Sequence, residues 1–290
     1  MLGAITERDS PLVVDVQSLE DAPYELVGEM LRAADREVGL SAGGRGWIRR
    51  IAPPGWRRGL ISGSREAVER SAWTSLIVGI AGSPGVEWLT PLDRLVFCEN
   101  KLIQGRVAQG LGVSIPRTAV VSLPEAIPAE FGENVVVKPL GSSHFAEADQ
   151  QERVVWAESM SRRDERLKLL DGAPFLVQEH LVAEYHLRVV TVAGQAWSCA
   201  LDATNLPVDW RRHEAAHHSF VPFDSPDVCD RALMVAAAMS LGYSSQDWLL
   251  TGDDAVLLDV NPAGQWLFLE EHTASEVTAS IAQWLGGHLR

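Results

Sequence analysis

Residues 257–270 read LLDVNPAGQWLFLE, and this stretch decides the fold because an apolar strand ends in two side chains that can bind a metal. Asp259 and Asn261 are two residues apart, so on a strand both side chains point to one face. Their oxygens suit a hard cation such as magnesium, and Asp247 adds a third oxygen if its own short apolar segment pairs with this strand. Magnesium held in this way usually shares its remaining positions with water and nucleotide phosphates, so the stretch indicates ATP chemistry.

The composition excludes several classes of protein. The chain has 290 residues, 46% of them hydrophobic, and a formal net charge of -14. This length predicts two or three compact units. The negative charge argues against a nucleic-acid backbone or an anionic membrane as the main partner, since both need a basic surface.

The cysteines and the N-terminus predict a cytoplasmic protein. Cys98, Cys199 and Cys229 have neither metal-like nor disulfide-like spacing, which fits a reducing compartment. The N-terminus lacks the basic head and apolar run of a signal peptide. No apolar run approaches the ~20 residues that a membrane helix needs.

The pattern of apolar residues predicts an α+β fold built on antiparallel sheets. In the first part of the chain we expect a strand over 11–16 and helices over 22–38 and 65–80, forming a small α/β unit that closes near Leu95. Later elements are expected as helices over 99–111, 231–241 and 276–285, the last with Ser275 as N-cap, strands over 135–137, 175–179, 187–192 and 196–201, and a hairpin of 247–250 with 255–260. Alternation of short strands with helices is typical of α+β layers.

Two lysines are candidates for phosphate binding. Lys138 ends a strand before the Gly-Ser-Ser loop of residues 141–143, so its ammonium could reach phosphates while loop amides close over them. A lysine whose charge simply reaches solvent is the alternative, and the short motif alone favours it. Lys101 opens a helix, where a cation is disfavoured unless Glu99 or a bound phosphate compensates. An ordinary solvated turn explains Lys101 equally well.

Residues 178–181 read QEHL and end a strand, where backbone groups can contact an adenine edge. Arg188 lies on the next apolar strand, and an arginine is costly to bury there unless it is paired, so it belongs either to an ion pair or to a site for an anionic substrate. Arg211 lies in a loop, where a surface cluster is the ordinary interpretation. His213, His217 and His218 lack the carboxylate or cysteine that would complete a metal site.

Taken together, these motifs occur in the order used by ATP-grasp ligases, and the chain resembles the graspetide synthetases, the maturases of microviridin-type peptides. The resemblance covers roughly residue 47 to the C-terminus. The matching segments are WIRR (47–50), EWLTP (87–91), ENKLIQGRVAQGLGVSIPRT (99–118), VVVKPLGSS (135–143), LRVVTVAG (187–194), DWR (209–211) and NPAGQWLFLE (261–270). The GQW ending is the most family-specific part. Ribosomal-protein glutamate ligases share the wider order without that ending.

The resemblance implies a fold and a reaction. Two α+β subdomains, over 99–180 and 181–290, would clamp ATP, and residues 1–98 would form a small N-terminal α/β domain. The family activates a side-chain carboxylate as an acyl phosphate with ATP and magnesium. The acyl group is then joined to a Ser or Thr hydroxyl, or to a Lys amine, of a ribosomally made precursor peptide, giving a macrocyclic ester or amide. A precursor peptide with its leader would be the partner, and a homodimer is expected.

The resemblance also assigns site residues. By this assignment the nucleotide would contact Lys101, Lys138, Ser142, Ser143, Gln178, Glu179, His180, Leu181, Glu184 and His186, the metal would be bound by Asp247, Asp259 and Asn261, and the catalytic residues would be Arg188 and Arg211. Three departures from the family pattern stand beside it. Asp259 replaces a usual glutamate, His186 replaces an acid that contacts ribose, with Glu184 as the alternative contact, and the segment before Trp47 is short.

Two other functions remain open from the sequence. One is a glutamate or amino-acid ligase that acts on a small molecule or a protein tail. The other is a non-catalytic nucleotide-binding module, which the retained lysines and metal ligands disfavour. Residues 144–171, rich in charges from Glu147 onward, are either the surface that contacts the leader or an ordinary solvated helix pair.

Overall fold

The computed structural model describes residues 12, 24–33, 36–41, 43–49, 63–141, 144–146, 152–170, 172–252 and 254–287. Its N-terminal part begins with an antiparallel meander of β1 (Tyr24–Val27), β2 (Met30–Ala33) and β3 (Arg36–Gly39). The helix predicted over 22–38 is therefore wrong, and the strand predicted over 11–16 lies outside the described residues. Gly28 turns the chain between β1 and β2 with a φ of 59°, which favours glycine. Arg32 then donates hydrogen bonds across the sheet to Glu25 and Glu37. The helical spacing of the residues in this segment did not predict these cross-strand pairs.

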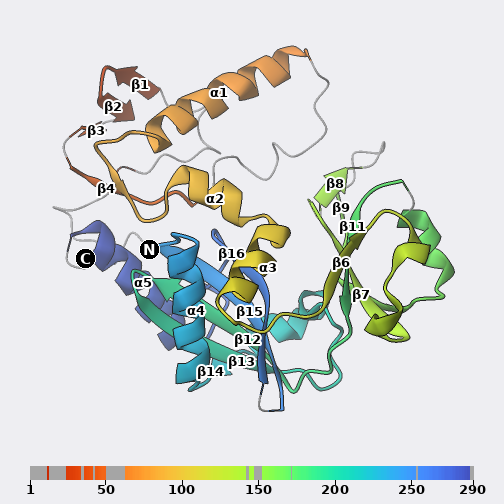
Figure 1. Cartoon of the computed structure of the whole chain (residues 1–290). Helices are drawn as coiled ribbons and strands as arrows, with labels where there is room; N and C mark the ends of the chain where they lie inside the picture. The colour runs from red at the N-terminus through yellow and green to blue at the C-terminus, as the bar shows by residue number, and fades with distance from the viewer. Residues whose placement is uncertain are drawn as a thin grey trace.

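The N-terminal part continues with a helix and a short pair of strands. Helix α1 (Arg65–Ala81) is confirmed, and the Ser64 side chain caps it by accepting a hydrogen bond from the Ala67 amide. Strands β4 (Arg45–Gly46) and β5 (Glu87–Trp88) pair in parallel, and α2 (Leu92–Cys98) follows them. Figure 1 shows this part above the rest of the chain, with α2 leading into α3 (Lys101–Gly110).

A four-stranded antiparallel sheet, the central sheet, follows α3. Its order is β10-β7-β11-β6, formed by β6 (Thr118–Val121), β7 (Asn134–Pro139), β10 (Glu158–Ser161) and β11 (Phe175–Glu179). Val135, Val137 and Val177 are buried in its core. Strands β8 (His144–Ala146) and β9 (Glu152–Val154) form a separate hairpin. A helix pair over 144–171 is thus wrong, because the described part of this segment contains strands and a 3-10 turn over Glu165–Leu170.

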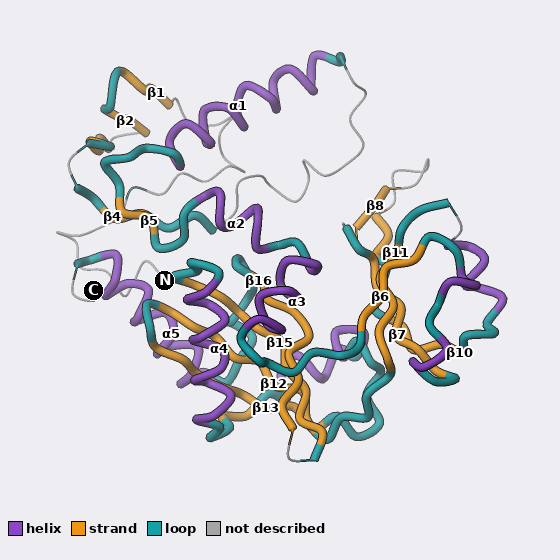
Figure 2. Tube along the Cα trace, in the orientation of Figure 1, coloured by secondary structure: helices purple, strands orange, loops and turns teal. Residues whose placement is uncertain are grey.

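The second large sheet, the C-terminal sheet, has the order β14-β13-β12-β15-β16 and is antiparallel throughout. Its strands are β12 (Tyr185–Val192), β13 (Gln195–Asp202), β14 (Val221–Pro222), β15 (Tyr243–Thr251) and β16 (Asp254–Asn261). Figure 2 shows it beside the central sheet, with α4 (Pro226–Ala238) across it and α5 (Glu271–Leu285) near the C-terminus. The predicted strands and the β15–β16 hairpin are confirmed.

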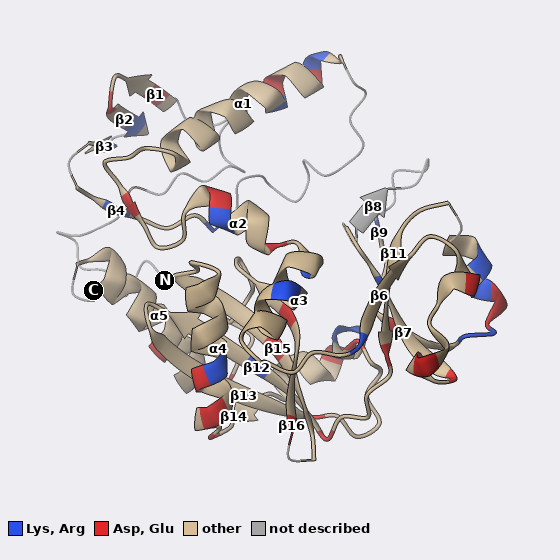
Figure 3. Ribbon diagram, in the orientation of Figure 1, with Lys and Arg blue, Asp and Glu red and all other residues tan. Residues whose placement is uncertain are grey.

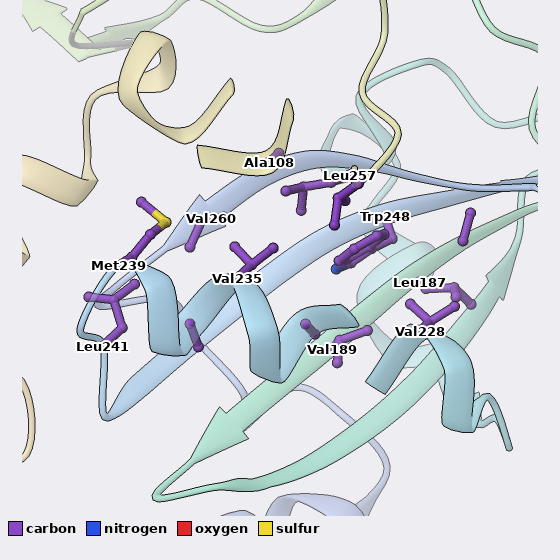
Figure 4. Packing of buried hydrophobic residues seen from close by; sticks show 14 of the residues in the cluster. Ala108, Leu187, Val189, Val228, Val235, Met239, Leu241, Trp248, Leu257 and Val260 are labelled. Atoms are coloured by element: carbon purple, nitrogen blue, oxygen red, sulfur yellow. The ribbon is translucent and has the colours of Figure 1, made fainter. Parts of the chain in front are cut away.

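The two faces of the C-terminal sheet have different coverings. On one face, α4 and α3 pack over Leu187, Trp248 and Val260, and Figure 4 shows Val235 of α4 among these side chains. On the other face, α5 covers Val190 and Val192 with Ile281 and Trp284. The rest of this second face, nearer the start of β12, carries polar side chains. Alternating side chains on the strands therefore separate a dry core from a polar surface.

The ends of two helices differ from the sequence prediction. Helix α4 begins at Pro226, because proline suits the first turn, where its missing N–H is not needed. Helix α5 begins at Glu271, so Ser275 is not its N-cap. The Glu270 carboxylate caps it instead by accepting from the His272 and Thr273 amides. Among the residues that the structure describes, no helix combines the length and apolar character that crossing a bilayer requires.

Gly242, before β15, offers a test of how the N-terminal part joins this sheet. A Cβ at this position would lie 1.8 Å from the Leu89 carbonyl oxygen, and the next amide, that of Tyr243, donates to Thr90. We expect Gly242→Ala to destabilise the protein by about 2 kcal/mol or more, because the obstacle is backbone that cannot rotate away. Chemical denaturation would measure this change. Gly110→Ala, where a Cβ meets nothing within 4 Å, is the control, and equal stability of both variants would contradict the close approach.

Candidate active site

The polar surface of the C-terminal sheet brings together side chains from three neighbouring strands. Asp247 on β15 lies directly opposite Asp259 on β16, and Arg188 on β12 lies opposite Asp247 on its other side. Asn261 follows Asp259 by two residues and pairs with Ser245, which precedes Asp247 by two. Because side chains alternate along a strand, the two aspartates and the asparagine share one face. The predicted geometry of these three residues is confirmed.

A β-bulge gives Asp259 this orientation. The pairing of β15 with β16 shifts between Asp247 and Trp248, so that Trp248 lies opposite Leu257 rather than Leu258. Leu257 and Val260 consequently both enter the dry core although they are three residues apart, as Figure 4 shows. Leu258 and Asp259 both line the cavity on the opposite side. Bulges often turn a side chain toward a functional site in this way.

Each aspartate is paired with a cation. Arg188 Nη1 lies 2.7 Å from Asp247 Oδ1, and Lys101 Nζ lies 2.9 Å from Asp259 Oδ1. The sequence left Glu99 as a group that could balance Lys101, but Asp259 on the adjoining strand does so. Figure 3 shows basic positions on α3 close to an acidic position on that strand.

The local charges hold Asp259 in its ionised form. Burial alone would raise the pKa of this carboxyl, but the charge and hydrogen bond of Lys101, together with the charges of Lys138 and Arg211, hold the pKa below its usual value. A deprotonated carboxylate opposite a second carboxylate, with an amide oxygen on the same face, is a donor set that suits magnesium. The residues present therefore fit the metal that the sequence suggested.

Lys138 faces this surface from the central sheet. It lies near the end of β7, and its side chain lines the same cavity as Asp247 and Asp259. Burial lowers the pKa of Lys138 to about 8, with Asp259 opposing and Lys101 reinforcing the shift. Burial disfavours the charged ammonium, so a bound phosphate would stabilise it.

Arg211 reaches the cavity from the loop after β13. Its Nε lies 2.7 Å from Asp209 Oδ1 and its Nη2 lies 2.7 Å from Asp209 Oδ2, so the two residues form a bidentate ion pair. Asp209 is buried and also accepts a hydrogen bond from the amide of Ala157, which lies between β9 and β10. The Arg211 guanidinium lies 5.9 Å from the Trp156 ring centre. The pair raises the pKa of Arg211, so this cation stays charged. The sequence prediction omitted Asp209, although the acid in the DWR motif was the available signal.

The cavity between the two sheets has a volume of about 370 Å³. Its walls include, among the predicted site residues, Lys101, Lys138, Gln178, Glu179, His180, Leu181, His186, Arg211, Asp247, Asp259 and Asn261. The residues that sequence reasoning missed include Pro116, Val136, Trp210 and the loop 206–208. The structure thus gathers segments that are far apart in sequence around one space.

Several predicted residues have other positions or partners. Ser142 and Ser143 lie outside the described residues. Glu184 is exposed, is not in the cavity wall, and accepts from the Gly252 amide. The Glu179 carboxylate accepts from the amide and the Nε of Arg117. His186 is buried in the wall, and burial lowers its pKa, which favours the neutral ring.

Arg188 is buried and reaches the cavity through its partner Asp247 rather than lining the wall itself. Its guanidinium lies 5.3 Å from the Phe268 ring centre, and its Nε is a buried donor that finds no hydrogen-bond partner among the residues that the structure describes. Buried donors are almost always satisfied in native proteins, so an unsatisfied one in a site needs an explanation. An anionic group that enters this region would supply the acceptor.

The histidine cluster of the nearby loop makes apolar contacts. His217 packs edge-on against Trp210 and Phe268. Within the described part of the chain, no group of three or more His, Cys, Asp or Glu side chains is placed to hold a metal ion. The candidate metal site has only two residues of these types, Asp247 and Asp259, because its third member, Asn261, offers an amide oxygen.

Comparison with known proteins places this geometry in context. No protein-family model and no curated protein matches the chain. Among solved structures, it is similar to macrocyclase MdnC bound with precursor peptide MdnA from Microcystis aeruginosa MRC, with 23% identity, a TM-score of 0.76, and coverage of 94% of this chain and 90% of that one.

Two further structures are similar over nearly the whole chain. The RiPP-associated ATP-grasp ligase of Chryseobacterium gregarium, in complex with ADP and a leader and core peptide, has 19% identity, a TM-score of 0.81, and coverage of 96% of this chain and 88% of that one. The ATP-grasp ligase PsnB, complexed with minimal precursor, Mg and ADP, has 16% identity, a TM-score of 0.70, and coverage of 94% and 88%. The predicted α+β class is confirmed, and the chain has the ATP-grasp fold.

Proposed function

We propose that this protein is an ATP- and magnesium-dependent ligase that forms ester or amide crosslinks within a ribosomally made precursor peptide. The observation that carries the proposal is the arrangement of Asp247, Asp259 and Asn261 on one side of the cavity and Lys138 on the other. Oxygen ligands for magnesium then face a cation for phosphate across a space between two sheets. This is the arrangement that phosphoryl transfer from a nucleotide requires.

The similar structures support the choice of substrate. MdnC is a macrocyclase bound with its precursor peptide, and the Chryseobacterium enzyme is in complex with ADP and a leader and core peptide. PsnB is complexed with Mg and ADP as well as a minimal precursor. Since this chain matches each of them over at least 94% of its length, we propose that ATP, magnesium and a peptide with a leader are its own ligands.

The proposed roles are those that the sequence assigned. Lys101 and Lys138 would hold the nucleotide phosphates, and residues 178–181 would contact the adenine. His186 would contact the ribose, with Glu184 as the alternative, and Ser142 and Ser143 would contact the phosphates. Asp247, Asp259 and Asn261 would bind the metal. Arg188 and Arg211 would neutralise charge on the phosphoryl group as it transfers.

The reaction divides into two transfers. A side-chain carboxylate of the peptide attacks the γ-phosphorus of ATP, ADP leaves, and an acyl phosphate forms. A hydroxyl or amine of the same peptide then attacks the acyl carbon, phosphate leaves, and the attacking group gives up its proton. Bound magnesium would neutralise the negative charge that builds up during the first transfer.

A direct test of this function incubates the protein with ATP, magnesium and peptides that contain both carboxylate and Ser, Thr or Lys side chains. The expected products are ADP and a peptide that has lost one water. Added hydroxylamine should divert the acyl phosphate to a hydroxamate. Formation of AMP in place of ADP, or turnover with free amino acids and none with any peptide, would contradict the proposal and favour another ligase.

Lys138 gives the nucleotide site a pH dependence. In the nucleotide-free protein the pKa of Lys138 is about 8, so this side chain loses its charge as the pH rises through that value. Phosphate binding favours the charged form, so binding at higher pH must also take up a proton. We expect the affinity for ADP to fall above pH 8 by up to about tenfold per pH unit.

Calorimetric titrations on both sides of pH 8 would measure this effect. Lys138→Arg is the matched control, since a guanidinium stays charged over the whole range. The variant should lose this part of the pH dependence. Identical pH profiles for the wild type and the variant would contradict the assignment of Lys138 as a phosphate ligand.

The boundaries and assembly of the protein remain predictions. We propose that residues 1–98, 99–180 and 181–290 form the N-terminal, central and C-terminal units. Cleavage by a protease at low concentration should then release fragments that end near residues 98 and 180. The homodimer, the cytoplasmic location and the contact of the leader with residues 144–171 likewise await measurement.

A further inference from the structure

The turn after the metal-ligand strand is held by side chains from elsewhere in the chain. Residues 262–265 follow Asn261, and three successive carbonyls in this turn accept hydrogen bonds from side chains. The pairs are Arg49 Nη1 with Ala263 O, Tyr243 OH with Gly264 O at 2.7 Å, and Ser245 Oγ with Gln265 O at 3.3 Å. We call these three donors the carbonyl clamp.

Arg49 is the member of the clamp that comes from the N-terminal part. Its guanidinium lies 5.5 Å from the ring centre of Trp266 and 6.0 Å from that of Trp47. Trp47, Tyr243 and Trp266 contact one another with ring centres 5.6 to 5.7 Å apart. Arg49 and Ala263 are 214 residues apart in the sequence. Residues 47–49 and the turn before Trp266 therefore pack against each other.

The turn itself has little freedom to move. A Cβ on Gly264 would lie 2.5 Å from the Cβ of Ser245 and 3.0 Å from that of Asn261, so the backbone of the turn packs directly on the strand pair. The Gly264 amide also donates to the Asn261 carbonyl at 3.1 Å. Any shift of the turn would therefore move Asn261.

From this arrangement we infer that Arg49 is a positioning residue for the metal site, acting through the Ala263 carbonyl on Asn261. The inference rests on the proposed function, because it takes Asn261 as a magnesium ligand. Among the described residues, Arg49 is in contact neither with the cavity wall nor with Asp247 or Asp259, so its effect should fall on the metal rather than on the nucleotide. Groups that orient metal ligands typically change metal affinity by about 10- to 100-fold when removed.

The chain provides a matched control for Arg49. Arg45 also comes from the N-terminal part, donates to a backbone carbonyl, that of Trp284, at 2.7 Å, and lies 4.9 Å from the ring centre of the same tryptophan. Trp284 belongs to α5, the helix that follows the metal strand and its turn. Arg45 and Arg49 thus make the same kind of contact, but only the Arg49 contact adjoins a metal ligand.

The experiment titrates ADP into the protein at increasing magnesium concentrations and records the magnesium concentration that gives half of the full increase in affinity. In Arg49→Met this midpoint should rise about tenfold, while the affinity for ADP without magnesium stays that of the wild type. In Arg45→Met the midpoint should stay that of the wild type. Thermal unfolding of both variants shows how much stability each contact contributes.

Three results would overturn the inference or its basis. An unchanged midpoint in Arg49→Met would show that Arg49 only joins two parts of the protein. An equal rise in Arg45→Met would show that general loosening, not positioning, is responsible. Wild type that binds ADP without any effect of magnesium would instead overturn the proposed function on which the inference rests.

Tyr243→Phe provides a second test that does not depend on the folding of Arg49→Met. This change removes only the hydroxyl that donates to Gly264 O and keeps the ring between Trp47 and Trp266. The magnesium midpoint should rise about fivefold, which is the change in an equilibrium that the loss of one hydrogen bond typically causes. A wild-type midpoint in a folded Tyr243→Phe variant would count against the carbonyl clamp.

Discussion

Replacing Arg188 with alanine should lower the rate of product formation by about 10³-fold or more while the protein stays folded. Arg188 is buried beside Asp247, and within the described part of the chain its Nε is a buried donor without a hydrogen-bond partner. A charge held in this way is worth most when negative charge develops on a transferring phosphoryl group, and least in the resting protein. Asp247, whose side chain is 21% exposed, can rehydrate when Arg188 is removed.

The rate would be followed as ADP release together with the loss of one water from the peptide. Arg188→Lys is the control, because it keeps a positive charge but loses the planar fork and the Nε donor. We expect it to be slower than wild type and faster than Arg188→Ala. Wild-type turnover in a folded Arg188→Ala variant would remove Arg188 from the catalytic group.

Asp259→Ala should weaken magnesium-dependent nucleotide binding by roughly 100-fold or more. The change deletes one of the two carboxylates of the candidate metal site and leaves Lys101 without its partner 2.9 Å away. It also removes a negative charge that acts on both Lys101 and Lys138. The affinity for magnesium therefore falls, while the affinity for metal-free ADP does not fall, because the two lysines remain and a charge that repels the phosphates is gone.

Asp254→Ala is the matched control for this change. Asp254 opens the same strand, is exposed, and lies outside the cavity wall. Calorimetry of ADP with and without magnesium should give wild-type values for this variant. If Asp259→Ala also retained the magnesium effect, the metal would have to be bound by other residues.

The C-terminal hairpin shows how far the sequence determines this site. Short apolar runs in 247–250 and 255–260 predicted two paired strands, and the spacing of Asp259 and Asn261 predicted a common face. The second prediction rests on the period of a strand, which is a local property. The bulge beside Trp248, which lets Leu257 and Val260 of one strand both enter the core, was not predicted, because it depends on how this strand pairs with its neighbour.

Long-range partners could not be predicted from the residues alone. Lys101 and Asp259 are 158 residues apart, and the sequence left a neighbouring glutamate as the balancing charge. The DWR motif contains Asp209, but the hydrogen bond that this carboxylate accepts from the Ala157 amide could not be predicted. Tertiary contacts of this kind are set by the fold and have no local signal.

The N-terminal meander shows where local reasoning gave the wrong answer. Charged and apolar residues over 22–38 recur at helical spacing, yet Gly28 breaks the run and Arg32 pairs across strands with Glu25 and Glu37. These pairs are exposed and contribute little stability. Gly28, a residue that disfavours the interior of a helix, was the better signal in the sequence.

The central claim is that the cavity between the two sheets binds a nucleotide together with magnesium. The measurement that tests it most directly is calorimetric titration of the wild-type protein with ADP, with and without magnesium. We predict binding of ADP in both conditions, much tighter with magnesium. No binding in either condition would contradict the proposed ligase function and leave only the fold.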